Sequence, residues 1–471
     1  MTGAVDIAPP AIASATEIAA AFASGETTAR AAVAASLERI ARVDPRINSV
    51  TDVVAERALA RADRLDADRA AGAAAGPLAG VPFAVKNLFD IAGLATRAGS
   101  RINRDRAPAT ADATLVRRLE AAGAILVGAL NMGEYAYDFT GENVHDGNTR
   151  NPHDLGRMSG GSSGGSGGAI AAGLVPLVLG SDTNGSIRVP SAFCGCFGLK
   201  PTYGRLSRAG TFPFVGSLDH LGPMARTVAD LARAYDAMQG PDPADPAAAT
   251  RDAEPATPGL ETGLRDLRIA TAGGYFARGG DPEAFEAVAR VASALGAART
   301  VEIPEAARAR AAAYLITAAE GASLHLDRLR TRADAFDPAV RDRLIAGAMM
   351  PAPWVQAAQR FRRWYRDAVR AVFAEVDVIL APATPCRAPA SGQTTFVLDG
   401  VTLPVRANIG VYTQPISFIG LPVVAVPVWL DAGLPLGVQV IAAPWREEAA
   451  LRVARVLERE GVARAPVARL A

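Results

Sequence analysis

Lysine is almost absent from this sequence of 471 residues. Only Lys86 and Lys200 occur, and arginine supplies the other 47 of the 49 basic residues. Arginine keeps its charge at any biological pH, whereas a buried lysine can lose its proton. The two lysines are therefore candidates for positions where a basic group must become neutral, with close packing or chance as the competing explanation.

Clustered charge, long apolar runs and a disulfide framework are also lacking. The formal net charge is +1 and basic residues are mixed with acidic ones, so no nucleic-acid or polybasic membrane surface is expected. No apolar run approaches the roughly 20 residues of a membrane-spanning helix. Met1–Ala23 lacks the pattern of a secretion signal, and three cysteines make no disulfide framework. The chain is predicted to be cytoplasmic.

Metal-binding and cofactor motifs are absent too. The four histidines show neither HExxH nor another metal-binding spacing. Cys194-Gly-Cys196 lacks the two-residue spacer and the second pair of a zinc site. We therefore expect no metal and no cofactor, and we interpret these residues as structural. The histidines are His145, His153, His220 and His325.

Short apolar runs alternate with helical stretches along the chain, which predicts an α/β fold. The segment 1–70 is predicted to be helical, with a capping box from Ser14 to Glu17 and with Thr28 capping a helix that ends near Arg42. The predicted strands are 80–86, 124–128, 174–179, 267–271, 376–381, 423–428 and 437–442, and the predicted helices include 169–172, 283–295 and 447–460.

We expect one domain over 1–471, although the length alone would allow two or three. Within it, 75–235 carries the motifs described below, and 240–264 is a surface connection between two halves, with a domain linker as the alternative. A helical insert at 304–373 is expected near the substrate pocket. Its aromatic residues either line that pocket or, as we favour, pack between helices: Trp354, Phe361, Trp364 and Tyr365.

A glycine- and serine-rich segment at 160–168 allows several interpretations. As a phosphate-binding loop it lacks the Gly-Lys-Ser/Thr that should follow, and as a dinucleotide loop it has Ile170 at the third glycine position. A flexible linker would not run directly into an apolar helix and strand. The segment fits G-x-S-x-G about Ser162 and Ser163, but a nucleophile elbow needs a preceding strand and a histidine base.

The segment from Asp182 to Arg188 carries a stronger signal. It follows an apolar run, so Ser186 stands near the end of a predicted strand, where ligands bind in open α/β sheets. The small residues before it can direct backbone N–H groups at one point, as in an oxyanion hole. Lys86 ends another apolar run, and burial there would lower its pKa and make it a base. A serine between the two would relay the proton.

These segments resemble the amidase signature family. Ser186 lies 24 positions after Ser162, which fits the serine pair of that family. The resemblance covers nearly the whole chain and implies a single α/β/α domain with a large mixed β-sheet flanked by helices. The matching segments are 80–87 around Lys86, 160–166 around Ser162, 182–190 around Ser186, 193–202, 217–223 and 437–445.

The resemblance also implies roles for individual residues. Ser186 would be the nucleophile, Ser162 a bridging serine beside a cis peptide bond, and Lys86 the base. Lys200 has no assigned chemistry and is interpreted as structural. The implied oxyanion hole consists of the backbone N–H groups of Thr183, Asn184, Gly185 and Ser186, and the implied acyl pocket includes Ala136 and Tyr137.

Within the family, the segments 149–154 and 204–208 and residue Asn184 are similar to 1-carboxybiuret hydrolases and related carbamate-cleaving amidases, including metagenomic urethanases. Asn184 replaces the glycine of many family members, and asparagine tolerates left-handed backbone. The chain departs from the subgroup at Asp146, where an aromatic is expected, and at Phe197, where tryptophan is expected. A homodimer or a complex with a small helical accessory subunit is compatible with this resemblance.

The sequence therefore predicts an amidohydrolase that works through an acyl- or carbamoyl-enzyme on a small-molecule amide or carbamate. Biurets, urethanes, anilides and aliphatic amides all remain candidate substrates. The alternative is an ammonia-generating amidotransferase subunit that works with a partner. A catalytically idle scaffold is disfavoured because Lys86, Ser162 and Ser186 are all present.

Overall fold

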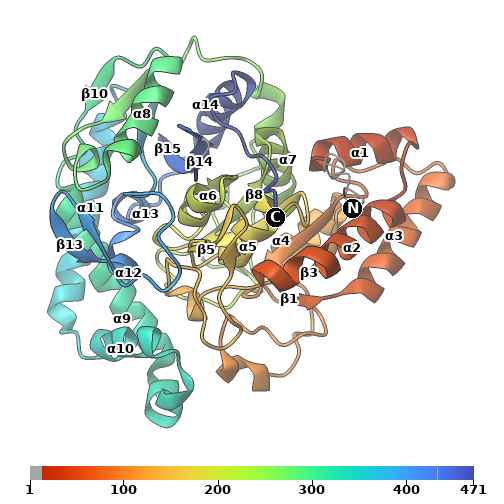
Figure 1. Ribbon diagram of the computed structural model, residues 1–471, viewed down its shortest axis with the longest axis horizontal. Coiled ribbons are helices and arrows are strands. Elements are labelled where there is room, and N and C mark those ends of the chain that lie inside the picture. Colours follow the sequence, from red (N-terminus) through yellow and green to blue (C-terminus); the bar gives the residue numbers. More distant parts are fainter. Residues whose placement is uncertain (1–12, 432, 471) are drawn as a thin grey trace, which may run out of the picture.

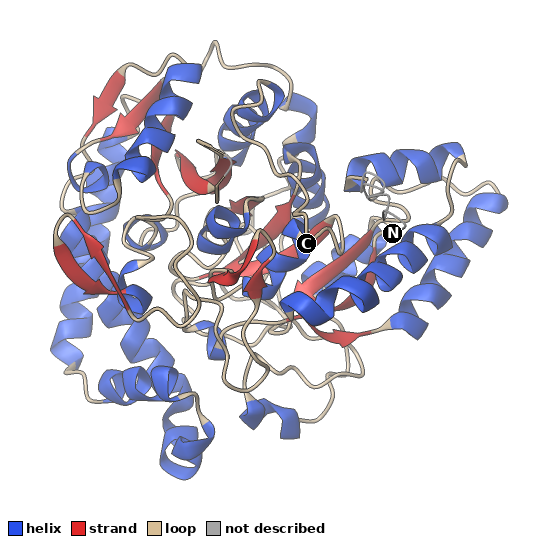
Figure 2. Ribbon diagram, viewed as in Figure 1, coloured by secondary structure: helices blue, strands red, loops and turns tan. Residues whose placement is uncertain are grey.

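The computed structural model describes residues 13–431 and 433–470, in which helices surround a central sheet (Figure 1, Figure 2). The helices are α1 (Ala15–Ser24), α2 (Ala29–Ile47), α3 (Ala55–Ala70), α4 (Thr114–Ala121), α5 (Gly164–Ala171), α6 (Arg188–Cys194), α7 (Val228–Met238), α8 (Pro282–Ala294), α9 (Ala306–Arg332), α10 (Pro338–Ala348), α11 (Ala352–Val372), α12 (Val405–Asn408), α13 (Gln414–Ser417) and α14 (Glu447–Arg459). The strands are β1 (Val50–Val53), β2 (Pro82–Lys86), β3 (Ile125–Leu130), β4 (Arg150–Asn151), β5 (Asp154–Met158), β6 (Leu177–Asp182), β7 (Phe197–Lys200), β8 (His220–Ala225), β9 (Ile269–Ala272), β10 (Arg299–Val301), β11 (Val378–Pro382), β12 (Thr395–Leu398), β13 (Val401–Pro404), β14 (Val423–Val428) and β15 (Leu436–Ala442).

Eleven of these strands form one mixed sheet in the order β1-β3-β2-β6-β8-β7-β14-β15-β11-β9-β10. β2 pairs in parallel with β3 and β6, whereas β6 and β8 are antiparallel. Every residue of β2, β3, β6, β14 and β15 is buried, because helices cover the sheet. Such strands appear in a sequence as continuous apolar runs. The predicted α/β fold with a large mixed sheet flanked by helices is therefore confirmed.

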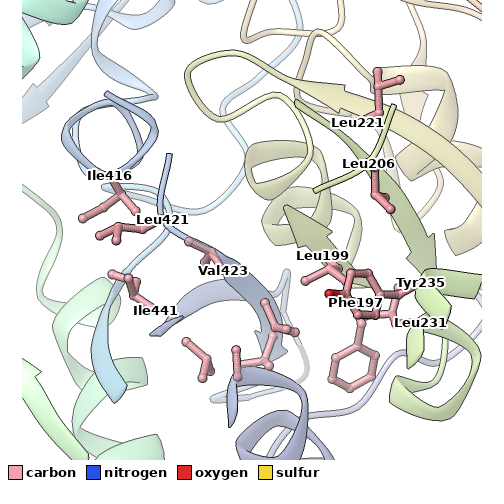
Figure 3. Packing of buried hydrophobic residues seen from close by; sticks show 14 of the residues in the cluster. Phe197, Leu199, Leu206, Leu221, Leu231, Tyr235, Ile416, Leu421, Val423 and Ile441 are labelled. Carbon is pink, nitrogen blue, oxygen red and sulfur yellow. The ribbon is translucent and has the colours of Figure 1, made fainter. Parts of the chain in front are cut away.

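The hydrophobic core lies between this sheet and its helices (Figure 3). Phe197 of β7 lies beside Leu231 and Tyr235 of α7, and all three side chains are buried. Phe197 replaces an expected tryptophan, so this departure falls in the core of the protein, where a smaller aromatic ring fills the space between β7 and α7.

The N-terminal helices carry the predicted caps. Ser14 and Glu17 form the capping box of α1, and the Thr28 side chain accepts a hydrogen bond from Ala31 N at the start of α2. The predicted end of this helix near Arg42 is wrong, because α2 continues through Pro45 to a left-handed cap at Asn48. Residues 1–12, which include part of the predicted helical segment 1–70 and of Met1–Ala23, lie outside the described residues.

The glycine-rich segment forms a longer helix than the sequence predicts. α5 already begins at Gly164, whereas the sequence indicated a helix only from 169, and β6 begins three residues later than predicted. A Cβ atom at Gly165 would lie 2.5 Å from the backbone nitrogen of Asn131, just after β3. Glycine weakens an isolated helix, but here it allows the helix to approach the sheet closely.

The insert at 304–373 consists of α9, α10 and α11, and α9 and α10 extend from one side of the molecule (Figure 1). The packing interpretation of its aromatic residues is correct for Tyr365, which is fully buried between helices. It is wrong for Trp354, which is 58% exposed, and holds only in part for Trp364, which is 49% exposed although its ring stacks on Phe361. None of the helices within 13–431 and 433–470 combines the length and apolarity needed to cross a membrane.

Candidate active site

The two motif strands β2 and β6 are neighbours in the sheet and run in parallel. Lys86 is the last residue of β2, and Asp182 is the last residue of β6. The carboxyl ends of parallel strands meet at the same edge of a sheet, which is where α/β proteins bind ligands. The topology therefore brings together segments that are almost 100 residues apart in the sequence.

Lys86 is fully buried, and its amine lies among three serine hydroxyls. The distances from Lys86 Nζ are 2.6 Å to Ser162 Oγ, 2.8 Å to Ser181 Oγ and 3.1 Å to Ser163 Oγ. Burial lowers the pKa of Lys86 to about 7, although nearby carboxylates such as Asp182 act in the opposite direction. Near neutral pH a large share of this amine is therefore unprotonated and can accept a proton.

Ser163 and Ser181 complete this cluster, and the motifs assigned neither of them a role beside the lysine. Ser163 Oγ donates a hydrogen bond to the Ser181 carbonyl at 3.2 Å, which connects the start of α5 to β6. Ser181 belongs to no motif of its own, and only its position beside the end of a strand could have indicated it. The Gly161–Ser162 peptide bond is cis.

Ser186 lies in the loop between β6 and α6, and a buried ion pair closes this loop. Asp182 Oδ2 accepts hydrogen bonds from the backbone N–H groups of Ile187 and Arg188 at 3.1 and 3.4 Å. The Arg188 guanidinium pairs with Asp182 at 2.9 Å, and both side chains are fully buried. Although burial opposes ionisation, the charge of Arg188 holds the pKa of Asp182 well below its usual range. The carboxylate and the guanidinium together fix the loop on which Ser186 stands.

The backbone N–H groups of this loop are available to a ligand. Within 13–431 and 433–470, the N–H groups of residues 183–186 donate no hydrogen bond to another protein group. The loop is held instead through other atoms, because Thr183 Oγ1 donates to Asp219 at 2.6 Å and Thr413 Oγ1 donates to the Asn184 carbonyl at 2.7 Å. Free N–H groups beside a serine are the arrangement that stabilises an oxyanion.

The backbone of Asn184 differs from what the sequence suggested. Many family members have glycine at this position, and asparagine tolerates left-handed backbone, so a left-handed conformation was expected at 184, but Asn184 has no positive φ. The positive φ falls on Gly185, at 145°, and a Cβ atom there would lie 2.3 Å from Thr413 Oγ1. That expectation was wrong because the unusual conformation belongs to the next residue, so position 184 accepts a side chain without backbone strain.

Ser186 lines a narrow cavity next to the insert. Ala136 and Tyr137, implied by the family resemblance, also line it, as do Tyr314 of α9 and Arg343 of α10. A second cavity of about 280 Å³ adjoins the first and reaches Ser181, whose hydroxyl contacts Lys86. A small substrate in the first cavity would therefore face Ser186.

Two arginines of the first cavity differ in how their charge is compensated. Arg406 pairs with Asp138 at 2.5 Å and with Glu142 at 2.8 Å. Arg343 lies over the ring of Tyr137, 3.7 Å from its centroid, and donates to the Tyr137 carbonyl. In the described part of the chain, no carboxylate lies within ion-pair distance of Arg343. The cavity therefore presents one uncompensated positive charge.

The remaining candidates from the sequence lie away from this cavity. Lys200 is fully buried and donates to the Pro201 carbonyl at 3.0 Å, and burial lowers its pKa to about 7, but it contacts none of the three serines. Asp146 pairs with Arg104 at 2.6 Å and does not line the cavity. Among the described residues, no group of three histidine, cysteine or acidic side chains is placed to hold a metal ion.

Comparisons with known proteins agree with this geometry. The chain matches the Amidase family over residues 31–451. AtzE, the 1-carboxybiuret hydrolase subunit of Pseudomonas sp. (strain ADP), is 55% identical over 450 residues, which cover 95% of this chain and 98% of that protein. A glutamyl-tRNA(Gln) amidotransferase chain of Chromohalobacter salexigens is 39% identical over 469 residues, covering 93% and 94%.

Solved structures give the same result. A chain from a vestigial protein complex that reveals the evolutionary origins of an s-triazine catabolic enzyme has a TM-score of 0.95 at 55% identity, covering 96% of this chain and 99% of that one. A bacterial aryl acylamidase of the amidase signature family has a TM-score of 0.86 at 27% identity, covering 95% and 96%. The protein belongs to the amidase signature family. It is a hydrolase of the amidase type, acting on carbon–nitrogen bonds, as its motifs predicted.

Proposed function

We propose that this protein hydrolyses a C–N bond of a small, negatively charged ureide or related amide through a covalent intermediate on Ser186. The observation that carries the proposal is the environment of Lys86. Its amine is fully buried, has a pKa of about 7 and lies 2.6 Å from Ser162 Oγ. A neutral amine in hydrogen-bond contact with a serine can act as a general base without a histidine.

The first half of the proposed reaction forms the covalent enzyme. Neutral Lys86 takes the proton of Ser162 while Ser162 takes the proton of Ser186, and Ser186 Oγ bonds to the carbonyl carbon. The negative charge moves to the former carbonyl oxygen, where the free N–H groups of 183–186 stabilise it. The proton then passes back through Ser162 to the leaving nitrogen, the C–N bond breaks, and the amine departs.

The second half releases the product. A water molecule gives its proton to the same relay, and its oxygen bonds to the carbonyl carbon. The bond between that carbon and Ser186 Oγ breaks, and Ser186 recovers its proton through Ser162 from Lys86. Each half needs Lys86 to begin neutral, so one pKa governs both steps.

The cavity supports a negatively charged substrate. Two arginines line this cavity. Among the described residues, Arg343 has no carboxylate partner, whereas the charge of Arg406 is already balanced by Asp138 and Glu142. A guanidinium is suited to binding a carboxylate because it offers parallel N–H donors. AtzE, at 55% identity, is a 1-carboxybiuret hydrolase subunit, which supports the same class of substrate.

The test compares two aryl ureides of similar shape, the anionic 4-ureidobenzoate and the neutral 4-ureido-N-methylbenzamide, by release of the aryl amine. We expect the wild type to prefer the carboxylate and Ser186→Ala to release no amine from either. Arg343→Met should lower kcat/KM for the carboxylate by roughly 10- to 100-fold, the value of a hydrogen bond to a charged group, with little effect on the amide. Arg343→Lys is the matched control and should keep part of the preference.

Equal losses on both substrates in Arg343→Met would show that Arg343 supports the fold and does not bind the carboxylate. Amine release by Ser186→Ala at the wild-type rate would refute the covalent mechanism itself. The two results are independent, so the substrate class and the mechanism are tested separately.

The amidotransferase alternative has relatives too, but at 39% identity against 55% for AtzE. We favour the hydrolase, acting in the cytoplasm, where the free and buried Cys194, Cys196 and Cys386 would stay reduced.

The related structure of a vestigial protein complex supports a complex of this chain with an accessory subunit. Gel filtration combined with activity assays distinguishes the two functions. An amidotransferase subunit that elutes without a partner would hydrolyse glutamine poorly, whereas the proposed hydrolase turns over its ureide without another chain.

A further inference from the structure

The side chain of Asn184 has an unused acceptor in the substrate cavity. Asn184 stands two residues before Ser186, lines the same cavity and is 6% exposed. Its Nδ2 donates to Thr317 Oγ1 of α9 at 2.9 Å. Its Oδ1 is buried and has no hydrogen-bond partner in the described part of the chain.

A buried carbonyl oxygen without a donor is uncommon, because nearly all buried polar side-chain atoms in folded proteins have a partner. The amide nitrogen faces Thr317 of α9, so Oδ1 lies on the side of the amide away from that hydroxyl. Only a donor can satisfy this atom. Because Asn184 lines the cavity of the nucleophile, a substrate bound there can supply this donor.

We infer that Asn184 selects substrates that carry an N–H group on the carbonyl that Ser186 attacks. A ureide has such an N–H on the side of the carbonyl away from the leaving amine. A urethane has an ester oxygen in place of this N–H. The ester oxygen and Asn184 Oδ1 are both acceptors, so no hydrogen bond could form between them. The inference rests on the proposed function and narrows it, because it assigns ureides and excludes urethanes as the preferred substrates.

The backbone of Asn184 is held independently of this side chain. Its carbonyl accepts a hydrogen bond from Thr413 Oγ1 at 2.7 Å, and its φ is not positive. Replacing the amide by a methyl group therefore removes the acceptor but keeps the anchor of the loop. The orientation of the Asn184 amide can also be changed through Thr317 of α9, because the Thr317 hydroxyl accepts a hydrogen bond from that amide.

The experiment uses two substrates of nearly the same shape, 4-(3-methylureido)benzoate and 4-(methoxycarbonylamino)benzoate. They differ by an N–H in place of an oxygen, and both release 4-aminobenzoate. The quantity measured is kcat/KM, which reports the steps up to the covalent enzyme, for the wild type and the variants Asn184→Ala, Thr317→Val and Thr317→Ser. The ratio of the two values cancels the different intrinsic reactivity of the substrates when variants are compared with the wild type.

The expected result is a ureide-to-urethane ratio that falls about 10- to 100-fold in Asn184→Ala, because one hydrogen bond is lost and one unsatisfied acceptor no longer penalises the urethane. Thr317→Val should also lower the ratio, by a smaller factor, whereas Thr317→Ser keeps the hydroxyl and should keep the ratio near the wild-type value. An unchanged ratio in Asn184→Ala overturns the inference, even when both rates fall together, as a purely structural role predicts. No amine release by the wild type from either substrate overturns the proposed function, and the inference with it.

Discussion

The rate of C–N cleavage should depend on pH through Lys86. The mechanism needs the neutral amine, so kcat/KM should fall about tenfold for each pH unit below about 7 and should level off above it. The sign follows from burial, which disfavours the charged ammonium and lowers the pKa of Lys86.

The pKa of Lys86 also determines what fraction of its amine is neutral at a given pH. An ordinary lysine has a pKa of 10.5, and burial lowers the pKa of Lys86 to about 7. About half of Lys86 is neutral at pH 7, against roughly 0.03% of an ordinary lysine amine. Burial of this one amine therefore raises the population of active base more than a thousandfold at neutral pH.

The assay is amine release from 4-ureidobenzoate between pH 5 and 10 at constant ionic strength. The matched control is Lys200, because burial also lowers its pKa to about 7 although it contacts none of the three serines. Lys200→Met should keep the midpoint of the profile, whereas Lys86→Arg should abolish activity because arginine does not lose its proton. A profile that is flat or rises toward acid, or one whose midpoint moves in Lys200→Met, would refute the assignment of Lys86 as the base.

Two further predictions concern the loop of Ser186. Arg188→Met leaves the buried Asp182 carboxylate without its partner and should lower the free energy of unfolding by about 3–5 kcal/mol in urea denaturation; a change below about 1 kcal/mol would mean that the pair does not hold the loop. Gly185→Ala places a Cβ atom 2.3 Å from Thr413 Oγ1 at a φ of 145°, so kcat/KM should fall at least about tenfold. Wild-type kcat/KM in this variant would show that the loop can shift without cost to the oxyanion hole.

The sequence predicted much of this architecture because its strands are buried on both faces. Runs such as the one ending at Lys86 show as uninterrupted apolar segments, and β14 spans the predicted 423–428. Helix boundaries were harder to predict. α5 begins inside a glycine-rich segment, and its stability comes from close contact with the sheet at Gly165, a tertiary effect that local propensity does not contain.

Some residues of the candidate site could be predicted from local motifs, and others depend on tertiary contacts. Lys86, Ser162 and Ser186 could be named because each lies in a local motif, and the structure places Lys86 against Ser162. Ser181 and Arg343 could not be named, because their part in the site depends on contacts between segments far apart in the sequence. The positive φ was assigned to the wrong neighbour for a related reason, since the close approach of Thr413, which leaves no room for a side chain at Gly185, is a contact between distant segments.

In the proposed mechanism, Ser186 carries the substrate's acyl or carbamoyl group during turnover. This covalent intermediate can be detected by rapid acid quenching of the wild type during turnover of 4-ureidobenzoate, followed by intact-mass and peptide mass spectrometry. We expect a carbamoyl mass increase on the peptide that contains Ser186, and no increase in Ser186→Ala or in Lys86→Met. An adduct on Ser162 or Ser163, or full turnover by Ser186→Ala, would contradict it.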